Sequence, residues 1–134
     1  MNPSDNTAKG RRGETIACDY LLREGYTIIY RNYHAAHGEI DIVAADGQYL
    51  VFVEVKARKS GQSSRYGRPA DAVNTAKKIH LTSAAEQYLR EHPTDLRPRF
   101  DIIEVYTDIN LGDAGVAAEV KHFKGAFTAC RERK

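Results

Sequence analysis

Four charged side chains interrupt two otherwise apolar runs near the middle of the chain, within residues 38–58. Glu39 and Asp41 lie in the first run, and Glu54 and Lys56 lie in the second. Burying a charge without a partner or a metal is costly, so charges in such runs indicate a site. Two carboxylates beside a lysine suit a divalent metal and a catalytic cation that act together on a phosphodiester.

The two runs are typical of β-strands joined by an Asp-Gly turn at residues 46–47, a strong hairpin signal. Residues two apart in a strand share a face, so a loop of even length brings all four charges to one face. A two-residue loop places Asp41 diagonal to Glu54, roughly 7–8 Å away, whereas a four-residue loop places the two directly opposite. Strict alternation also puts Ile40 and Ile42 together on the face that Asp41 does not share.

The residue types in this hairpin suit Mg²⁺ or Mn²⁺, because Mg²⁺ prefers oxygen ligands and usually takes one or two carboxylates with waters and a substrate phosphate. We expect Asp41 and Glu54 to bind the metal, with the Val55 carbonyl as a third ligand. Lys56 would orient the attacking water or stabilise charge on the phosphate. Glu14, on the inner face of the first expected helix, could bind through water or hold a second metal.

A structural charge cluster is the alternative, in which Lys56 pairs with Glu54 or Asp41 in an ordinary buried ion-pair network. A Glu-x-Lys triplet alone is common by chance in a chain of ordinary composition. A triplet that ends an apolar strand, with an aspartate of matching parity across a hairpin, is much rarer. The residues do not suit acyl transfer, since no pair of nucleophile and base is evident, and the chain has no glycine-rich phosphate loop.

Basic residues beside the hairpin favour a polyanionic partner, although the net charge of the chain is only +2. The segment 56–68 contains lysines and arginines but no acidic residue. Such clusters can bind nucleic acid while nearby carboxylates hold a cation, although many basic runs are simply solvated surface. We expect the phosphates of a nucleic acid to be contacted by Arg11, Arg12, Arg58, Lys59, Arg65, Arg68 and Lys77.

The length of 134 residues suits a single domain over residues 1–134. We expect residues 1–6 to be disordered and residues 59–70 to form a mobile basic loop. Cys18 and Cys130 show no zinc-binding spacing, and the polar start lacks the apolar region of a signal peptide. No apolar run approaches the roughly 20 residues needed to span a membrane. These features together predict a cytoplasmic protein without a membrane segment.

The remaining patterns predict an alternation of helices and strands around the hairpin. Helices are expected at 7–24 and 71–90, strands at 26–30, 97–106 and 114–122, and a short terminal helix within 123–134. Gly25 is a good stop for the first helix. The inward residues of the second helix are expected to be Val73, Ala76, Ile79 or His80, Ala84 and Leu89.

Several ordered motifs resemble the bacterial YraN-like family, which is similar to archaeal Holliday-junction resolvases and belongs with the PD-(D/E)xK superfamily. The motifs are Gly10-x-x-Gly13-Glu14, Arg31-Asn32-Tyr33, Gly38-Glu39-Ile40-Asp41, Val51-Phe52-Val53-Glu54-Val55-Lys56-x-Arg58, Gly67-x-Pro69, Lys77 and Arg99-Phe100-Asp101. The resemblance implies a restriction-endonuclease-like α/β fold, with a mixed central sheet of about five strands flanked by helices. It also implies Asp41, Glu54 and Lys56 as the catalytic signature and Glu14 as the helix acid. A proline usually precedes the catalytic aspartate in the superfamily, and Ile40 stands there in this chain.

We therefore expect a metal-dependent endonuclease that hydrolyses phosphodiester bonds in DNA, including branched or recombination intermediates. The alternative is a non-catalytic nucleic-acid-binding or DNA-processing accessory protein that retains the nuclease fold. A structural or protein-interaction domain is a third interpretation, and it predicts no salt-sensitive binding to nucleic acid. The related resolvases are homodimers, so the resemblance also implies a possible homodimer.

Overall fold

A computed structural model describes residues 8–59, 73–107 and 119–131 of the chain, as two helices and a five-stranded sheet. The helices are α1 (Ala8–Arg23) and α2 (Thr75–Glu91). The strands are β1 (Thr27–Ala35), β2 (Gly38–Ala45), β3 (Tyr49–Lys59), β4 (Arg97–Thr107) and β5 (Glu119–Phe127). In the described part of the chain, no helix is both long and apolar enough to cross a membrane.

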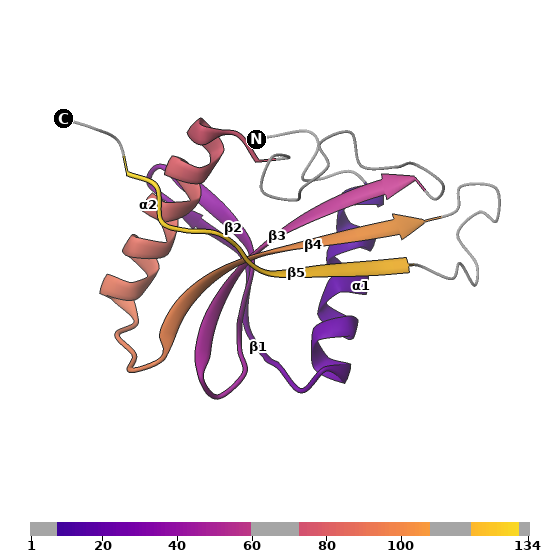
Figure 1. Ribbon diagram of the computed structural model, residues 1–134, viewed down its shortest axis with the longest axis horizontal. Coiled ribbons are helices and arrows are strands. Elements are labelled where there is room, and N and C mark those ends of the chain that lie inside the picture. The colour runs from indigo at the N-terminus through magenta and orange to yellow at the C-terminus, as the bar shows by residue number, and fades with distance from the viewer. Residues whose placement is uncertain (1–7, 60–72, 108–118, 132–134) are drawn as a thin grey trace.

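The sheet is mixed, with the order β1-β2-β3-β4-β5. Strands β3 and β4 pair in parallel through the α2 crossover, and the other neighbours pair antiparallel. This arrangement confirms the expected α/β architecture, which is that of a restriction-endonuclease-like domain. Figure 1 shows α1 and α2 on either side of this strongly twisted sheet.

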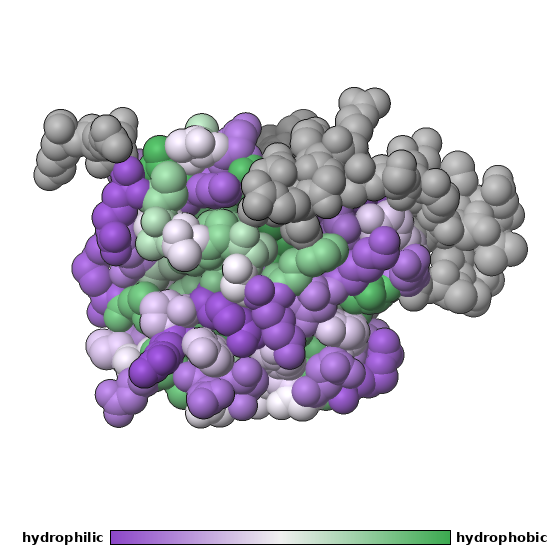
Figure 2. All heavy atoms as spheres, in the orientation of Figure 1, coloured by the Kyte–Doolittle hydropathy of each residue, from purple (hydrophilic) through white to green (hydrophobic). Residues whose placement is uncertain are grey.

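Each face of the sheet carries its own apolar cluster. One cluster joins the α2 residues Leu81, Ala84 and Tyr88 to Val43 and Phe52. The other lies beneath α1 and contains Ala17, Cys18 and Leu21 packed against the opposite sides of β2, β3 and β4. Partly buried apolar side chains border the α2 cluster, and Figure 2 shows apolar surface, with hydrophilic residues to its left and below it, on the face that carries α2 and β5.

Helix α1 ends as its sequence predicts. Gly25 has a φ of 91°, a left-handed conformation that glycine adopts without strain. Its N–H donates to the Leu22 carbonyl at 3.1 Å, and the Tyr26 N–H donates to the Leu21 carbonyl at 2.9 Å. These two bonds form a Schellman motif, which satisfies the last carbonyls of the helix and directs the chain into β1.

The hairpin connection has four residues rather than two, because Ala45 pairs with Leu50. The Asp46 carboxylate accepts hydrogen bonds from Tyr49 N at 2.7 Å and Gln48 N at 2.9 Å. These two bonds lower the pKa of Asp46. The two-residue register is therefore wrong, and the four-residue register, the other even-length possibility, is the one that occurs.

Strict alternation breaks in β1 and β2 at facing positions. Ile40 belongs to the α2 cluster and Ile42 to the α1 cluster, although alternation predicts one face for both. Because Tyr33 pairs with Ile40 and the residue two before it pairs with Ile42, the residue facing Asp41 is Asn32. Asn32 has a φ of 55°, and this left-handed residue reverses the facing of β1. The expectation that Ile40 and Ile42 share a face is therefore wrong.

The second helix starts later, and packs through a different face, than its sequence predicts. Asn74 caps it, with its side chain accepting a hydrogen bond from Lys77 N at 2.8 Å. The buried face consists of Leu81, Thr82, Ala84, Ala85 and Tyr88. Of the expected inward residues only Val73, which precedes the helix, and Ala84 are buried, while Leu89 packs at the cluster margin.

Residues 123–127 form part of a strand, whereas a helix is expected within 123–134. Strand β5 runs from Glu119 to Phe127 and lies at the edge of the sheet beside β4. Phe127 stacks on Phe100 with the ring centroids 4.9 Å apart, so its apolar contact is made from a strand. The predicted helix within 123–134 is thus wrong over its described part, although Phe123 does pack against the core. The expected disorder of 1–6 and most of the 59–70 loop lie outside the described residues.

Candidate active site

The candidate site lies where β2 and β3 separate. Their pairing runs from Ala45 and Leu50 to Ile42 and Val53, and the next positions along this register are Asp41 and Glu54. There the Asp41 carboxylate accepts a hydrogen bond from Val55 N at 2.8 Å. The backbone N–H of Val55 in β3 thus donates to a side chain of β2, and this hydrogen bond holds Asp41 beside Glu54.

The electrostatics of Asp41 are unfavourable for an ionised carboxylate. Its pKa is raised well above the usual value, first by burial and then by the nearby charge of Glu54. Glu14 raises the pKa further, while the Val55 N–H and the Lys77 ammonium act in the opposite direction. The fold therefore holds acidic groups together against their mutual repulsion, which is characteristic of functional sites but also occurs in structural networks.

Two lysines balance the charge of Glu54. Lys56 Nζ lies 3.7 Å from one carboxylate oxygen, and Lys77 Nζ lies 3.8 Å from the other. The Glu54 side chain is only 9% exposed, so these pairs are partly shielded from water. Lys56 comes from the same strand, whereas Lys77 reaches the site from the first turn of α2. The structure thus brings both lysines to one carboxylate.

Glu14 is placed on the α1 side of this site. The residue is buried, and its carboxylate lies 4.0 Å from the Arg31 guanidinium. Arg31 also donates to the Thr15 hydroxyl at 3.4 Å. The carboxylate acts on Asp41 through its charge, as the pKa of Asp41 records. Glu14 therefore lies near the acid pair, and its role toward a metal stays a prediction.

The predicted phosphate contacts divide into separate groups. Lys77 lies at the acid pair. Arg58 instead pairs with Glu104, with Nε 2.8 Å from the carboxylate, which also accepts from the Tyr106 hydroxyl at 2.9 Å. Arg12 is half-buried on α1. The placement of the remaining side chains, Arg11, Lys59, Arg65 and Arg68, lies outside what the structure describes.

The carboxylates at the site suit a magnesium ion that also binds waters and substrate, rather than a metal whose ligands all come from the protein. Within the described ranges, no three His, Cys, Asp or Glu side chains are arranged to hold a metal. Magnesium usually needs only one or two carboxylates, and its other positions are taken by waters and substrate oxygens. Asp41 and Glu54 would supply those two, and a cation between them would relieve the repulsion that raises the pKa of Asp41.

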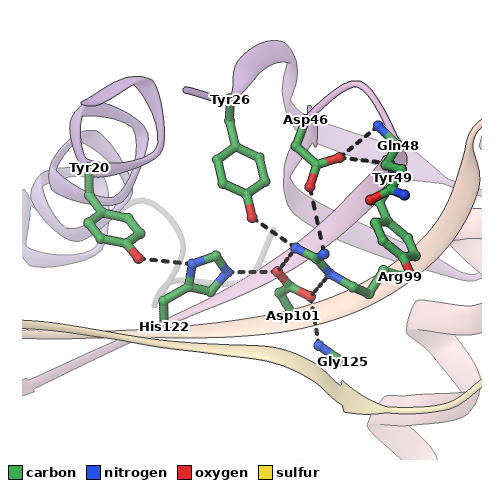
Figure 3. Close-up of polar contacts among 9 residues, drawn as sticks. All are labelled: Tyr20, Tyr26, Asp46, Gln48, Tyr49, Arg99, Asp101, His122 and Gly125. Carbon is green, nitrogen blue, oxygen red and sulfur yellow. Dashed lines mark hydrogen bonds and ion pairs between the residues drawn. The ribbon is translucent and has the colours of Figure 1, made fainter. Parts of the chain in front are cut away.

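A second charged network, which sequence reasoning missed, lies beneath α1 (Figure 3). Asp101 is fully buried, and its carboxylate accepts hydrogen bonds from Arg99 at 2.8 and 2.9 Å and from Gly125 N at 3.0 Å. His122 Nε2 lies 2.6 Å from the same carboxylate. Burial opposes ionisation of Asp101, but the bonds from His122 and Arg99 outweigh it and lower the pKa.

This network joins α1, the α1–β1 connection, the hairpin turn, β4 and β5. Tyr20 of α1 bonds to His122 of β5 at 3.0 Å, and Arg99 of β4 donates to the Tyr26 hydroxyl at 2.9 Å. The Arg99 guanidinium also lies 3.8 Å from Asp46 in the hairpin turn. The signal in the sequence was Arg99-Phe100-Asp101, two charges of equal parity in an apolar strand. The same reasoning singled out Glu54 and Lys56.

Comparison with known proteins places the chain among relatives of similar length. The sequence model of a family described as “Uncharacterised protein family UPF0102” matches residues 13–105. A UPF0102 protein of Chlorobium chlorochromatii is 43% identical over 129 residues, which cover 95% of this chain and 97% of the relative. A UPF0102 protein of Syntrophotalea carbinolica is 45% identical over 119 residues, covering 88% and 89%.

Proposed function

This chain belongs to the uncharacterised family UPF0102, and from its site we propose that it is a metal-dependent endonuclease that hydrolyses phosphodiester bonds in DNA. Branched or recombination intermediates are the proposed substrates, in keeping with the resemblance to resolvases. The proposal includes a cytoplasmic location, in keeping with the free thiols of Cys18 and Cys130.

One observation carries this proposal, namely the position of Asp41 at the point where β2 and β3 separate. Its carboxylate is held by Val55 N at 2.8 Å, although burial and the charge of Glu54 disfavour its ionised form. A purely structural acid would be expected to gain a close cationic partner, as Asp101 does from Arg99. This arrangement of Asp41 therefore supports a site that receives a cation better than it supports a structural network.

Each residue of the site has a distinct proposed role. Asp41 and Glu54 would hold Mg²⁺ or Mn²⁺, with the Val55 carbonyl as a further oxygen and Glu14 nearby. The bound metal would lower the pKa of a water and neutralise charge on the phosphate. Lys56, kept beside Glu54, would orient the attacking water or stabilise charge that develops on the phosphate oxygens.

Cleavage assays with matched variants test this function. Branched, nicked, linear and single-stranded DNA would be incubated with the wild-type protein and with Glu54→Gln, in Mg²⁺ and in Mn²⁺. Glu119→Gln provides the control, because Glu119 is exposed on β5 and pairs only with the exposed Lys121 among the contacts described for it. We expect Glu54→Gln to abolish cleavage while its folding is retained. Cleavage that survives in both Glu54→Gln and Asp41→Asn would refute the assignment.

A non-catalytic nucleic-acid-binding protein is the second candidate function. The observation in its favour is that Lys56 and Lys77 both lie near Glu54, as in a structural ion-pair network. Calorimetric titration with Mg²⁺ or Mn²⁺ separates the two candidates. Saturable binding that Asp41→Asn removes supports the nuclease, and salt-sensitive DNA binding without metal binding supports the accessory protein.

The partners are part of the same proposal. DNA is the proposed macromolecular partner, and a second copy of the chain is proposed from the resemblance to dimeric resolvases. Light scattering with and without a DNA junction measures the stoichiometry directly. A chain that stays monomeric on the junction would exclude the homodimer and would leave the chemistry at Asp41 and Glu54 unaffected.

A further inference from the structure

A pocket of about 280 Å³ lies beside the candidate active site, between α2 and the first residues of β2. His34, near the end of β1, also lines it. Its size is close to the lower limit of ordinary small-ligand sites, so a single phosphate-bearing group fits it better than a bulky ligand. The pocket is lined by His34, Gly38, Glu39, Lys77, His80 and Leu81.

Lys77 belongs to both the pocket and the acid site. Its ammonium lies 3.8 Å from Glu54, which is beyond ordinary hydrogen-bond distance, and its side chain is 37% exposed. An ammonium carries three donors, so Lys77 can face the pocket while it remains near Glu54. A group bound in the pocket is therefore adjacent to the position proposed for the scissile phosphate.

The remaining polar groups leave the pocket suited to an anion. His80, from the same helix as Lys77, also lines the pocket, and an imidazole ring can donate a hydrogen bond. The negative charge of Glu39 disfavours binding of an anion. Its carboxylate, however, lies 3.1 Å from His34 Nδ1, so it is directed toward the imidazole of the neighbouring strand. Lys77 and His80 are thus the groups best placed to donate hydrogen bonds to a phosphate.

The walls of the pocket are held together by close backbone packing. A Cβ atom added to Gly38 would lie 2.5 Å from the His80 carbonyl oxygen, so only glycine permits this contact. Two further bonds fix the end of β1 and the β1–β2 connection to α2, from the Tyr33 hydroxyl to Glu91 at 2.6 Å and from Ala36 N to Gln87 at 2.9 Å. The backbone of the pocket walls is therefore preorganised, which lowers the entropic cost of binding.

We propose that this pocket binds a phosphate group of the nucleic-acid strand, next to the phosphodiester held at Asp41 and Glu54. The proposal rests on the proposed function and adds to it a positioning site outside the acid pair. Phosphate contacts fix the register of a strand on a protein without reading its sequence. Lys77 and His80 are accordingly positioning residues, and they set which bond of the strand lies at the acids.

Binding measured without metal separates this proposal from catalysis. A fluorescent single-stranded oligonucleotide would be titrated in EDTA with the wild-type protein and with Lys77→Ala and His80→Ala. Lys121→Ala, which changes an exposed lysine on the opposite edge strand, is the control. We expect each pocket variant to weaken binding by about tenfold, the effect of one charge-assisted hydrogen bond. The salt slope should also fall by about one for Lys77→Ala.

Two further measurements define the ligand. Glu39→Gln should tighten binding, because it removes a negative charge from the pocket while the site for the phosphate remains. Inorganic phosphate titrated by NMR should shift the amide resonances of Gly38 and His80, and the oligonucleotide should compete for the same site. Shifts from inorganic phosphate that the oligonucleotide does not displace would overturn the assignment to a strand and indicate a free-phosphate site.

The outcomes distinguish this pocket from the proposed function. Pocket variants that fold, as circular dichroism shows, and bind the oligonucleotide like the wild type would overturn the pocket, even if the wild type cleaves DNA. A wild-type protein that never cleaves DNA, but loses binding in Lys77→Ala and His80→Ala, would overturn the nuclease and retain the pocket. His80→Ala keeps the backbone contact to Gly38, because that contact uses the carbonyl oxygen.

Discussion

Replacing Asp41 by asparagine is expected to stabilise the metal-free protein and to remove its response to metal. The asparagine side chain has almost the same shape, and its oxygen can still accept the hydrogen bond from Val55 N. The change removes a negative charge that burial and the charge of Glu54 both disfavour. The residue proposed to bind metal is therefore expected to weaken the fold when the metal is absent.

The size of this effect follows from the position of Asp41 opposite Glu54. Asp41 and Glu54 are the facing positions just beyond the last β2–β3 pair. Side chains at such positions lie about 5 Å apart, and two charges at that spacing repel by about 3 kcal/mol at an effective dielectric constant of about 20. Attraction to Lys77 and the stronger hydrogen bond that a carboxylate accepts offset roughly half of this. The net gain is about 1–2 kcal/mol, which raises Tm by about 3–7 °C in a chain of this size.

The gain must depend on pH in a defined direction. The pKa of Asp41 is higher in the folded protein than in the unfolded chain. The wild type therefore loses stability as the pH rises from about 4, the ordinary aspartate pKa, through the folded-state pKa. Below about pH 4 the carboxyl group is protonated in both states, and the advantage of Asp41→Asn disappears.

Urea unfolding in EDTA, between about pH 4 and pH 8, measures this difference. Asp95→Asn serves as the control, because Asp95 is exposed at the end of the α2–β4 connection. Saturating Mg²⁺ should then stabilise the wild type and leave Asp41→Asn unchanged. An Asp41→Asn protein that is less stable than the wild type at about pH 8 in EDTA would refute the reasoning on repulsion.

Three other substitutions test the framework around the site by their effect on chemical unfolding. His122→Phe should lower the free energy of unfolding by about 2–4 kcal/mol, because it leaves buried Asp101 without one of its donors; an unchanged value would contradict a structural role for the network. Gly38→Ala should cost about 1–3 kcal/mol, since its Cβ would clash with the His80 carbonyl, and a neutral effect would show that the two walls are not in fixed contact. Gly47→Ala should cost about 1 kcal/mol, because the φ of 94° is strained for alanine, whereas a stabilising effect would place the turn in another conformation.

The hairpin and its acids were accessible from the sequence because they depend on local rules. Apolar runs, an Asp-Gly turn and parity place Asp41 and Glu54 on one face for any even loop. Lys56 follows Glu54 by two residues, so it stays beside it by the same rule. The C-terminal end of α1 was predictable for the same reason, since Gly25 supplies the left-handed residue that the helix needs there.

The choice between the two even loop lengths was not local. Both keep the acids on one face, so parity does not separate them. Contacts from β4 favour the longer connection, through Arg97 N to the Gln48 carbonyl at 3.2 Å and through Arg99, which lies over the Tyr49 ring at 4.8 Å and near Asp46. Residues remote in sequence thus determine that Asp41 faces Glu54 directly.

Tertiary structure also decided which charges reach the site. Arg58 in β3 and Lys77 in α2 were both predicted to contact phosphates. In the structure, Lys77 lies near Glu54, whereas Arg58 pairs with Glu104 of β4. Periodicity gives the face of a helix or strand, but the partner across the fold depends on how the elements pack. The sequence therefore determined that Asp41 and Glu54 share a face. The packing of α2 and β4 determined that Lys77 reaches Glu54 and that Arg58 pairs with Glu104, because ion pairs between distant segments form only once the sheet and helices are in place.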